Sequence, residues 1–181
     1  MKPAPGSLAS VQGFVNTRNV LRGYDLLGNI GEARTWLVGH GLLDGGTRLG
    51  ETERLRLIEL REGLREILLA HNGDEAGESV EVLNELAEDA LLRVGFDEEA
   101  VPGLLPAGSG AAVGGVVARL LVAVVGAAYD GTWRRLKSCR NEECTWAFYD
   151  ASKNRSGSWC TMDVCGSRAK MRAYRRRRSE V

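Results

Sequence analysis

The stretch CRNEECTWAFYDASKNRSGSWCTMDVC, residues 139–165, carries all four cysteines of the 181-residue chain. Four residues separate the cysteines within each pair, and fifteen residues separate the two pairs. Two thiolate pairs on short loops, joined by a span long enough for a hairpin, suit tetrahedral coordination of zinc by four sulfurs. The predicted zinc ligands are Cys139, Cys144, Cys160 and Cys165.

A closed set of four sulfur ligands leaves no open coordination position, so the spacing predicts one structural Zn²⁺ rather than a catalytic one. The segment around it has few apolar side chains, and metal binding would supply much of its folding free energy. Two disulfides or four unconnected thiols are the alternatives. Residues 1–14 lack the continuous apolar core of a secretory signal, and this favours a cytoplasmic protein with reduced thiols.

The zero formal net charge of the chain hides two halves of opposite sign. Residues 1–130 contain 11 Lys/Arg and 19 Asp/Glu, whereas residues 131–181 contain 13 and 5. This asymmetry indicates two functional parts, of which the basic one faces a polyanion. The alternative is that the halves neutralise each other across an internal interface. We predict a domain boundary after residue 130, where charge sign, cysteine content and helical period all change.

The first 130 residues are predicted to be mainly helical, because apolar side chains recur with the period of an amphipathic helix. The predicted helices cover residues 51–70, 78–94 and 111–129, and a shorter helix within residues 31–43 is predicted to stop near Gly39 and Gly41. Residues 9–22 are predicted to form a helix or an extended lead-in. Residues 95–110, rich in Gly and Pro, are predicted to form a loop with a short strand pair. The stretch 111–129 carries Arg119 in its middle, so we expect a buried helix and no membrane partner.

The chain after the last cysteine is strongly basic. Its cations are Arg168, Lys170, Arg172, Arg175, Arg176, Arg177 and Arg178. As a helix, this segment would present a basic stripe, and a zinc site at its start would fix its position for contact with DNA. Ser167 is the predicted N-cap, its hydroxyl accepting the backbone N–H of Lys170. The alternative is a solvated, frayed tail.

Other polar groups are predicted to have structural roles. The sequence DASKN at residues 150–154 has turn chemistry, although such a group could also contact a phosphate or a base. The aromatic side chains of residues 146–149 are expected beside the metal. His40 and His71 lie singly in the helical half and are predicted to be surface or capping residues rather than ligands.

The elements C-x4-C-x-W-x-F-x-D-x-S-K-N and W-C-x-M-x-x-C-G-S-R-A-K, with the arginine-rich end, resemble the CGNR zinc-finger proteins, whose helical N-terminal part is the ABATE domain. The likeness extends to GFVNTRN, residues 13–19, and LRLIELREGLREIL, residues 55–68. The family is described as stress-induced transcription regulators with a DNA-binding finger. The resemblance implies that the four cysteines bind zinc and that Arg168 and Lys170 contact nucleic acid.

Two features of this resemblance leave alternatives open. The family's CGNR sequence is Cys-Gly-Ser-Arg here, at residues 165–168. A serine can replace an asparagine that caps a helix, but not one that reads a base edge. Asn16, Thr17 and Arg18 also resemble a family signature. These three residues either fix the N-terminal segment to the helices or form part of a small-molecule pocket.

Together these observations predict a mainly α chain, with an ABATE-like helical domain at residues 1–130 and a zinc-binding module at 131–181 that ends in a basic helix. We expect a cytoplasmic, nucleoid-associated transcription regulator that binds DNA through its four-Cys finger. The helical domain would sense a ligand or mediate assembly, for instance as a homodimer. The alternative is a zinc-stabilised RNA-binding or ribosome-associated protein. An enzyme ranks last, because the sequence has no phosphate-binding loop, catalytic Cys–His pair or paired carboxylates.

Overall fold

The computed structural model describes residues 2–88, 90–96, 98–107 and 112–179. Its helices are α1 (Leu8–Val15), α2 (Ile30–Gly39), α3 (Glu51–Ala70), α4 (Ser79–Ala87), α5 (Ala112–Tyr129) and α6 (Ser167–Ser179). Within these residues the strands form three two-stranded antiparallel ribbons. They are β1 (Arg18–Asn19) with β2 (Tyr24–Asp25), β3 (Leu92–Phe96) with β4 (Pro102–Pro106), and β5 (Leu136–Ser138) with β6 (Ala147–Tyr149). A 3-10 turn (Trp133–Arg135) precedes β5, and a π-helical turn (Met162–Gly166) leads into α6.

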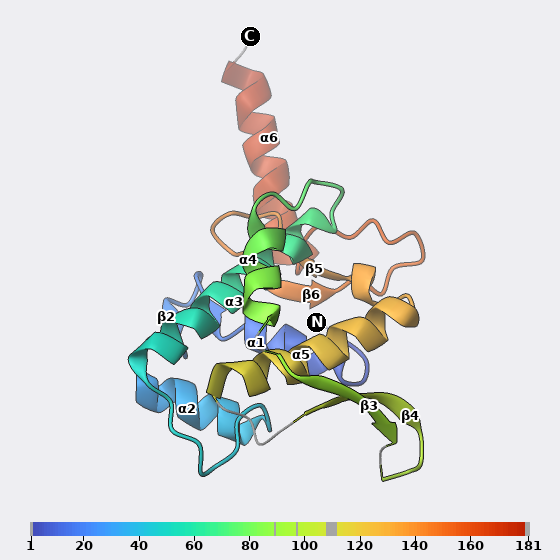
Figure 1. The fold of residues 1–181 in the computed structure, drawn as a ribbon. Helices are drawn as coiled ribbons and strands as arrows, with labels where there is room; N and C mark the ends of the chain where they lie inside the picture. The colour runs from blue at the N-terminus through green and yellow to red at the C-terminus, as the bar shows by residue number, and fades with distance from the viewer. Residues whose placement is uncertain (1, 89, 97, 108–111, 180–181) are drawn as a thin grey trace.

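The core lies where α1, α3 and α5 pack against one another (Figure 1). On α3, Leu57, Leu64 and Leu68 recur at helical spacing and are buried. On α5, Val116 and Leu120 are buried against them. The helices predicted for residues 51–70 and 111–129 therefore form as expected, although Ala111 and residues 108–110 of the predicted loop lie outside the described residues.

The charged residue in the middle of α5 leaves the apolar core. Arg119 Nη2 donates to Asp44 Oδ1 at 2.9 Å, and Nη1 donates to the carbonyl oxygen of Leu42 at 3.4 Å. Among the described residues, no helix has both the length and the apolar character that crossing a bilayer requires.

The helix predicted for residues 78–94 is too long. Helix α4 ends at Ala87, and Leu92–Phe96 forms strand β3, in which Val94 pairs with Leu104 of β4. Leu92, Val94 and Phe96 alternate along the strand, and a period of two is satisfied by pairing with the following segment. Val94 is 81% exposed and is not part of a buried helix face. The strand pair expected within residues 95–110 is present but begins earlier.

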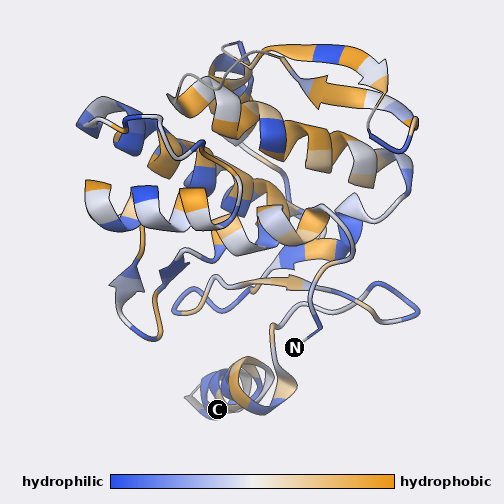
Figure 2. Cartoon of the chain, turned by 90° about the horizontal axis from the view of Figure 1, so that it is seen from below, coloured by the Kyte–Doolittle hydropathy of each residue, from blue (hydrophilic) through white to orange (hydrophobic). Residues whose placement is uncertain are grey.

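The C-terminal segment packs on the helices through its first ribbon. Strand β5 lies beside α3, and β6 lies beside α1. Leu136 in β5 and Ala147 in β6 are 0% exposed and belong to the main core. Helix α6 projects away from the body (Figure 1) and is largely hydrophilic (Figure 2). The prediction of a mainly α chain is thus correct in part. The helices form the core, but of the two-stranded ribbons only the one near residues 95–110 was predicted. The boundary after residue 130 stays a prediction.

Candidate metal centre

The four cysteine sulfurs come together in one cluster, all within 4.8 Å of one another. The Sγ atom of Cys160 lies 3.6 Å from that of Cys144 and 3.7 Å from that of Cys165. A zinc ion with four sulfurs at about 2.3 Å requires sulfur–sulfur edges of about 3.8 Å. These distances fit that tetrahedron and are far longer than the roughly 2.05 Å of a disulfide bond. All four cysteines are free thiols.

Short backbone turns bring the four sulfurs together. Cys139 directly follows β5, and Cys144 closes a turn in which its N–H donates to the carbonyl oxygen of Asn141 at 2.7 Å. Cys160 follows a long loop, and Cys165 lies in the π-helical turn before α6. Three of the cysteines are buried, and Cys160 is half-buried. The cluster is therefore closed on most sides, as in a structural zinc site.

The electrostatics of the cluster favour a cation at its centre. The hydrogen bond with Cys139 raises the pKa of Cys144 to about 12. Hydrogen bonds with Cys139 and Cys144 also raise the pKa of Cys160. One thiolate in the cluster thus makes its neighbours keep their protons, because like charges at this distance repel. A divalent cation removes that penalty and binds all four sulfurs as thiolates, so the donor set fits Zn²⁺.

Comparison with known protein families identifies two regions of the chain. A family model for the CGNR zinc finger matches residues 135–178. The ABATE model, described as "Putative stress-induced transcription regulator", matches residues 9–130. The chain belongs to the ABATE family and carries a CGNR zinc finger. No curated protein matches it.

Asn141 links the CGNR cluster to the basic helix, a contact that the sequence did not reveal. Its side chain is 1% exposed. Nδ2 donates to the Cys165 sulfur at 3.6 Å, and Oδ1 accepts from Arg172 Nη2 at 3.0 Å. The only signal in the sequence is an asparagine between the first two cysteines. Arg172, predicted to contact nucleic acid, therefore has a partner inside the chain, and its nucleic-acid role stays a prediction.

Substitution of Asn141 by alanine is expected to weaken zinc binding by about 10- to 100-fold, as is typical when a hydrogen bond to a metal ligand is lost. Competition with a chromogenic chelator measures the zinc affinity. Glu142→Ala, at the exposed neighbouring position, is the control and should retain wild-type affinity. Equal affinities for the two variants would show that the Asn141 contact does not stabilise the metal site.

The other predicted nucleic-acid residues lie along α6, which is helical as expected. Arg168 forms an ion pair with Glu143 at 3.7 Å, and the guanidinium of Arg178 lies 6.0 Å from the ring centre of Tyr174. The remaining cations of the set are exposed on the same helix: Lys170, Arg175, Arg176 and Arg177. The structure thus gathers the basic residues on one projecting element, and their contact with nucleic acid stays a prediction.

The predicted N-cap at Ser167 is wrong. The Ser167 hydroxyl donates to the carbonyl oxygen of Met162 at 3.1 Å, and its backbone is already helical, with φ −65° and ψ −42°. The π-helical turn Met162–Gly166 runs directly into α6, so Ser167 does not have the extended backbone that a side-chain N-cap requires. In the CGNR finger of this chain, the helix is therefore continuous with the turn that carries Cys165.

A buried ion pair holds the loop between the two cysteine pairs. Lys137 Nζ donates to Asp150 Oδ2 at 2.9 Å, and both residues are 3% exposed. Asp150 also accepts the backbone N–H groups of Ser152 at 3.0 Å and Gly157 at 2.8 Å, which confirms the turn predicted for DASKN. Burial raises the Asp150 pKa, but hydrogen bonds from Ser152 and Lys137 outweigh it and lower the pKa to about 2. The aspartate is therefore ionised at neutral pH.

The signature residues Asn16, Thr17 and Arg18 lie where the ABATE helices meet the finger. Asn16 forms two hydrogen bonds with the backbone of Ala147 in β6, at 2.8 and 2.9 Å. The Thr17 hydroxyl donates to the carbonyl oxygen of Phe14 at 2.8 Å, and Arg18 pairs with Glu62 at 3.7 Å. These contacts are of the kind expected if the three residues fix the N-terminal segment in place. The alternative role in a ligand pocket stays a prediction.

Both histidines stand apart from the cysteine cluster. His71 caps α3, and its Nδ1 lies 2.7 Å from the carbonyl oxygen of Leu136, so it fixes β5 to the helix. Burial lowers the His71 pKa. His40 caps α2 and stacks on Trp36 with ring centres 4.0 Å apart. Their predicted capping and surface roles are confirmed.

Proposed function

We propose that this ABATE-family chain is a transcription regulator that binds DNA through the basic helix of its CGNR finger. The observation that carries the proposal is the connection between the metal cluster and α6. Cys165 is part of the helical turn that continues into α6, and Asn141 joins its sulfur to Arg172. A zinc ion in this cluster would fix the direction of a helix that extends away from the body (Figure 1). The cations of this helix are exposed.

The dimensions of the helix favour duplex DNA over duplex RNA. Helix α6 has 13 residues, so it is about 20 Å long. The major groove of B-DNA admits an α-helix, whereas the major groove of A-form RNA is too narrow and deep. The RNA-binding alternative would therefore require contacts outside the RNA duplex groove. Competition between duplex DNA and a structured RNA of equal length decides between the two.

Phosphate contacts should dominate the affinity for DNA. Log K is then expected to fall linearly with log salt, by about 0.9 for each phosphate neutralised. Replacing Arg175–Arg178 with glutamine should reduce that slope by as much as about 3.6 and weaken binding to all sequences alike. Fluorescence anisotropy of a labelled duplex across a salt series measures both quantities.

The control for this experiment is the double variant Arg48→Gln/Arg93→Gln, at two exposed arginines outside the finger. Its slope should equal that of the wild type. If the Arg175–Arg178 variant also keeps the wild-type slope and affinity, the C-terminal arginines do not contact DNA and the proposal fails. Ligand sensing or assembly by the helical region, a homodimer, nucleoid association and the lack of enzymatic activity stay parts of the proposal.

A further inference from the structure

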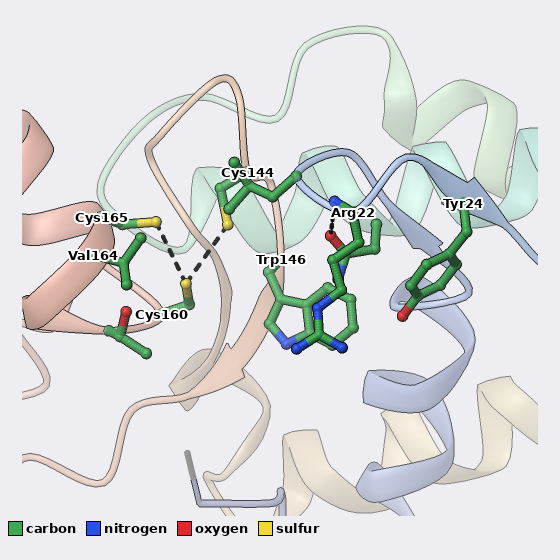
Figure 3. Close-up of a pocket in the computed structure, with 10 residues that line it drawn as sticks. Arg22, Tyr24, Cys144, Trp146, Cys160, Val164 and Cys165 are labelled. Atoms are coloured by element: carbon green, nitrogen blue, oxygen red, sulfur yellow. Dashed lines mark hydrogen bonds between the residues drawn. The ribbon is translucent and has the colours of Figure 1, made fainter.

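A cavity of about 400 Å³ lies between the β1–β2 hairpin and the CGNR cluster (Figure 3). The hairpin contributes Leu21, Arg22 and Tyr24 to its wall, and the finger contributes Trp146, Cys160 and Val164. In Figure 3 the side chains of Trp146 and Arg22 lie between the cysteines and Tyr24. The volume is in the range of small-molecule sites, roughly 300–1,000 Å³.

Arg22 is the charged group of this cavity. Its backbone N–H donates to Asn19 Oδ1 at 3.0 Å, which fixes the hairpin turn. Its guanidinium has no hydrogen-bond or ion-pair partner among the residues that the structure describes, in contrast to the buried Arg61 and Arg65. The cavity wall includes no aspartate or glutamate. Cys144, Cys160 and Cys165 also line the cavity, but their thiolates would be bound to Zn²⁺, which leaves Arg22 as the charged side chain on this wall that a ligand can pair with.

The rest of the wall is apolar and aromatic. Leu21, Tyr24 and Val164 line it and are each about 40% exposed. Trp146 is half-buried beside the cysteine cluster. Aromatic and aliphatic surfaces of this kind bind planar ring systems. The cavity thus offers an apolar wall and one site for an anion.

Both sides of the cavity are held in place by contacts elsewhere. On the hairpin side, Asp25 of β2 accepts from Arg61 Nη2 at 2.9 Å. On the finger side, Arg65 donates to the carbonyl oxygen of Thr145 at 2.7 Å, directly before Trp146. A site formed before its ligand arrives loses less conformational entropy on binding. The walls come from the ABATE region and from the finger, so a ligand here would contact both.

We propose that this cavity binds a small aromatic carboxylate, with its ring against Trp146 and its carboxylate on Arg22. One guanidinium pairs with one carboxylate in a bidentate arrangement. A phosphate carries up to two negative charges, of which this single guanidinium could pair with one, and is therefore disfavoured. Because it would contact both the ABATE region and the finger, the ligand would stabilise their contact, a consequence that rests on the proposed regulatory function.

Isothermal titration of the zinc-loaded full chain, without DNA, tests the binding step. The probes are 1-naphthoate and the uncharged 1-naphthalenemethanol. Naphthoate is expected to bind at least about tenfold more tightly, because a charge-assisted hydrogen bond is lost with the alcohol. Arg22→Gln should abolish this difference, whereas Arg48→Gln, an exposed arginine outside the cavity, should preserve it. The indole N–H resonance of Trp146, assigned with Trp146→Phe, should shift with naphthoate.

Three results would overturn the proposed site. They are no naphthoate binding at millimolar concentration, equal binding of the two probes, or equal naphthoate affinity of the Arg22→Gln and Arg48→Gln chains. A DNA titration with and without naphthoate then tests the regulatory consequence. Naphthoate binding by a chain without DNA affinity would refute the proposed function and leave the ligand site supported. Unchanged DNA affinity in saturating naphthoate would refute the coupling alone.

Discussion

Replacement of Cys165 by serine is expected to release zinc and unfold the cysteine cluster and α6, while α1, α3 and α5 stay folded. Cys165 is 0% exposed and lies in the π-helical turn that continues into α6. Structural zinc supplies about 10–16 kcal/mol of binding free energy in comparable small modules. The cysteines with Phe148 form a small cluster separate from the main core, so the main core would survive its loss.

Zinc content of the purified chain and hydrogen exchange along its sequence measure the two parts of this result. The variant should contain much less than one zinc per chain and lose amide protection over residues 158–179. Strands β5 and β6 should keep part of their protection, because Leu136 and Ala147 lie in the main core. Ser167→Ala is the control, since among the described residues its hydroxyl bonds only to the Met162 carbonyl. Retained zinc and unchanged protection of α6 in the Cys165→Ser chain would contradict the metal assignment.

The second large effect is expected at the buried ion pair of the finger. Asp150→Ala leaves the ammonium of Lys137 buried without a charged partner, because both side chains are almost fully enclosed. Removing one member of such a pair costs about 3–5 kcal/mol of unfolding free energy. The loop carrying Ser152 and Gly157 also loses its acceptors. Urea denaturation of the zinc-loaded chain, followed by the finger's tryptophan fluorescence, measures the loss.

The double variant Asp150→Ala/Lys137→Met separates the effect of the ion pair on stability from the effect of the loop hydrogen bonds. It should recover much of the lost stability, because methionine is similar in length to lysine and buries no charge. A Ser156→Ala chain, changed at an exposed position of the same loop, serves as the matched control. If Asp150→Ala costs less than about 1 kcal/mol, the typical effect of an ordinary substitution, the pair does not stabilise the finger.

The sequence predicted those features that depend on spacing along the chain. The cysteine pattern was enough to predict that the four sulfurs lie together, because both pairs sit on short turns whose geometry is local. The periodic leucines of α3 and the apolar run of α5 were enough for the two central helices. The helix predicted for residues 78–94 was too long, because the apolar residues of a short segment can fit both a helix face and a strand.

Features that depend on contacts between distant residues did not appear in the sequence. Asn141 touches Arg172, 31 positions away, and Asn16 touches Ala147, 131 positions away. Lys137 gave no sign of burial, because a lysine within a short strand is ordinarily exposed. The cavity beside the cluster combines residues 19–24 with residues 144–165, and it forms only when the hairpin and the finger are packed together. Such arrangements follow from tertiary packing and not from local pattern.

The metal site at the base of α6 is tested most directly by X-ray absorption spectroscopy of the purified chain at the zinc edge. We predict one zinc per chain with four sulfur neighbours at about 2.3 Å and no nitrogen or oxygen ligand in the first shell. A shell containing nitrogen or oxygen, or a chain without zinc whose cysteines are paired as disulfides, would contradict the four-thiolate site formed by Cys139, Cys144, Cys160 and Cys165.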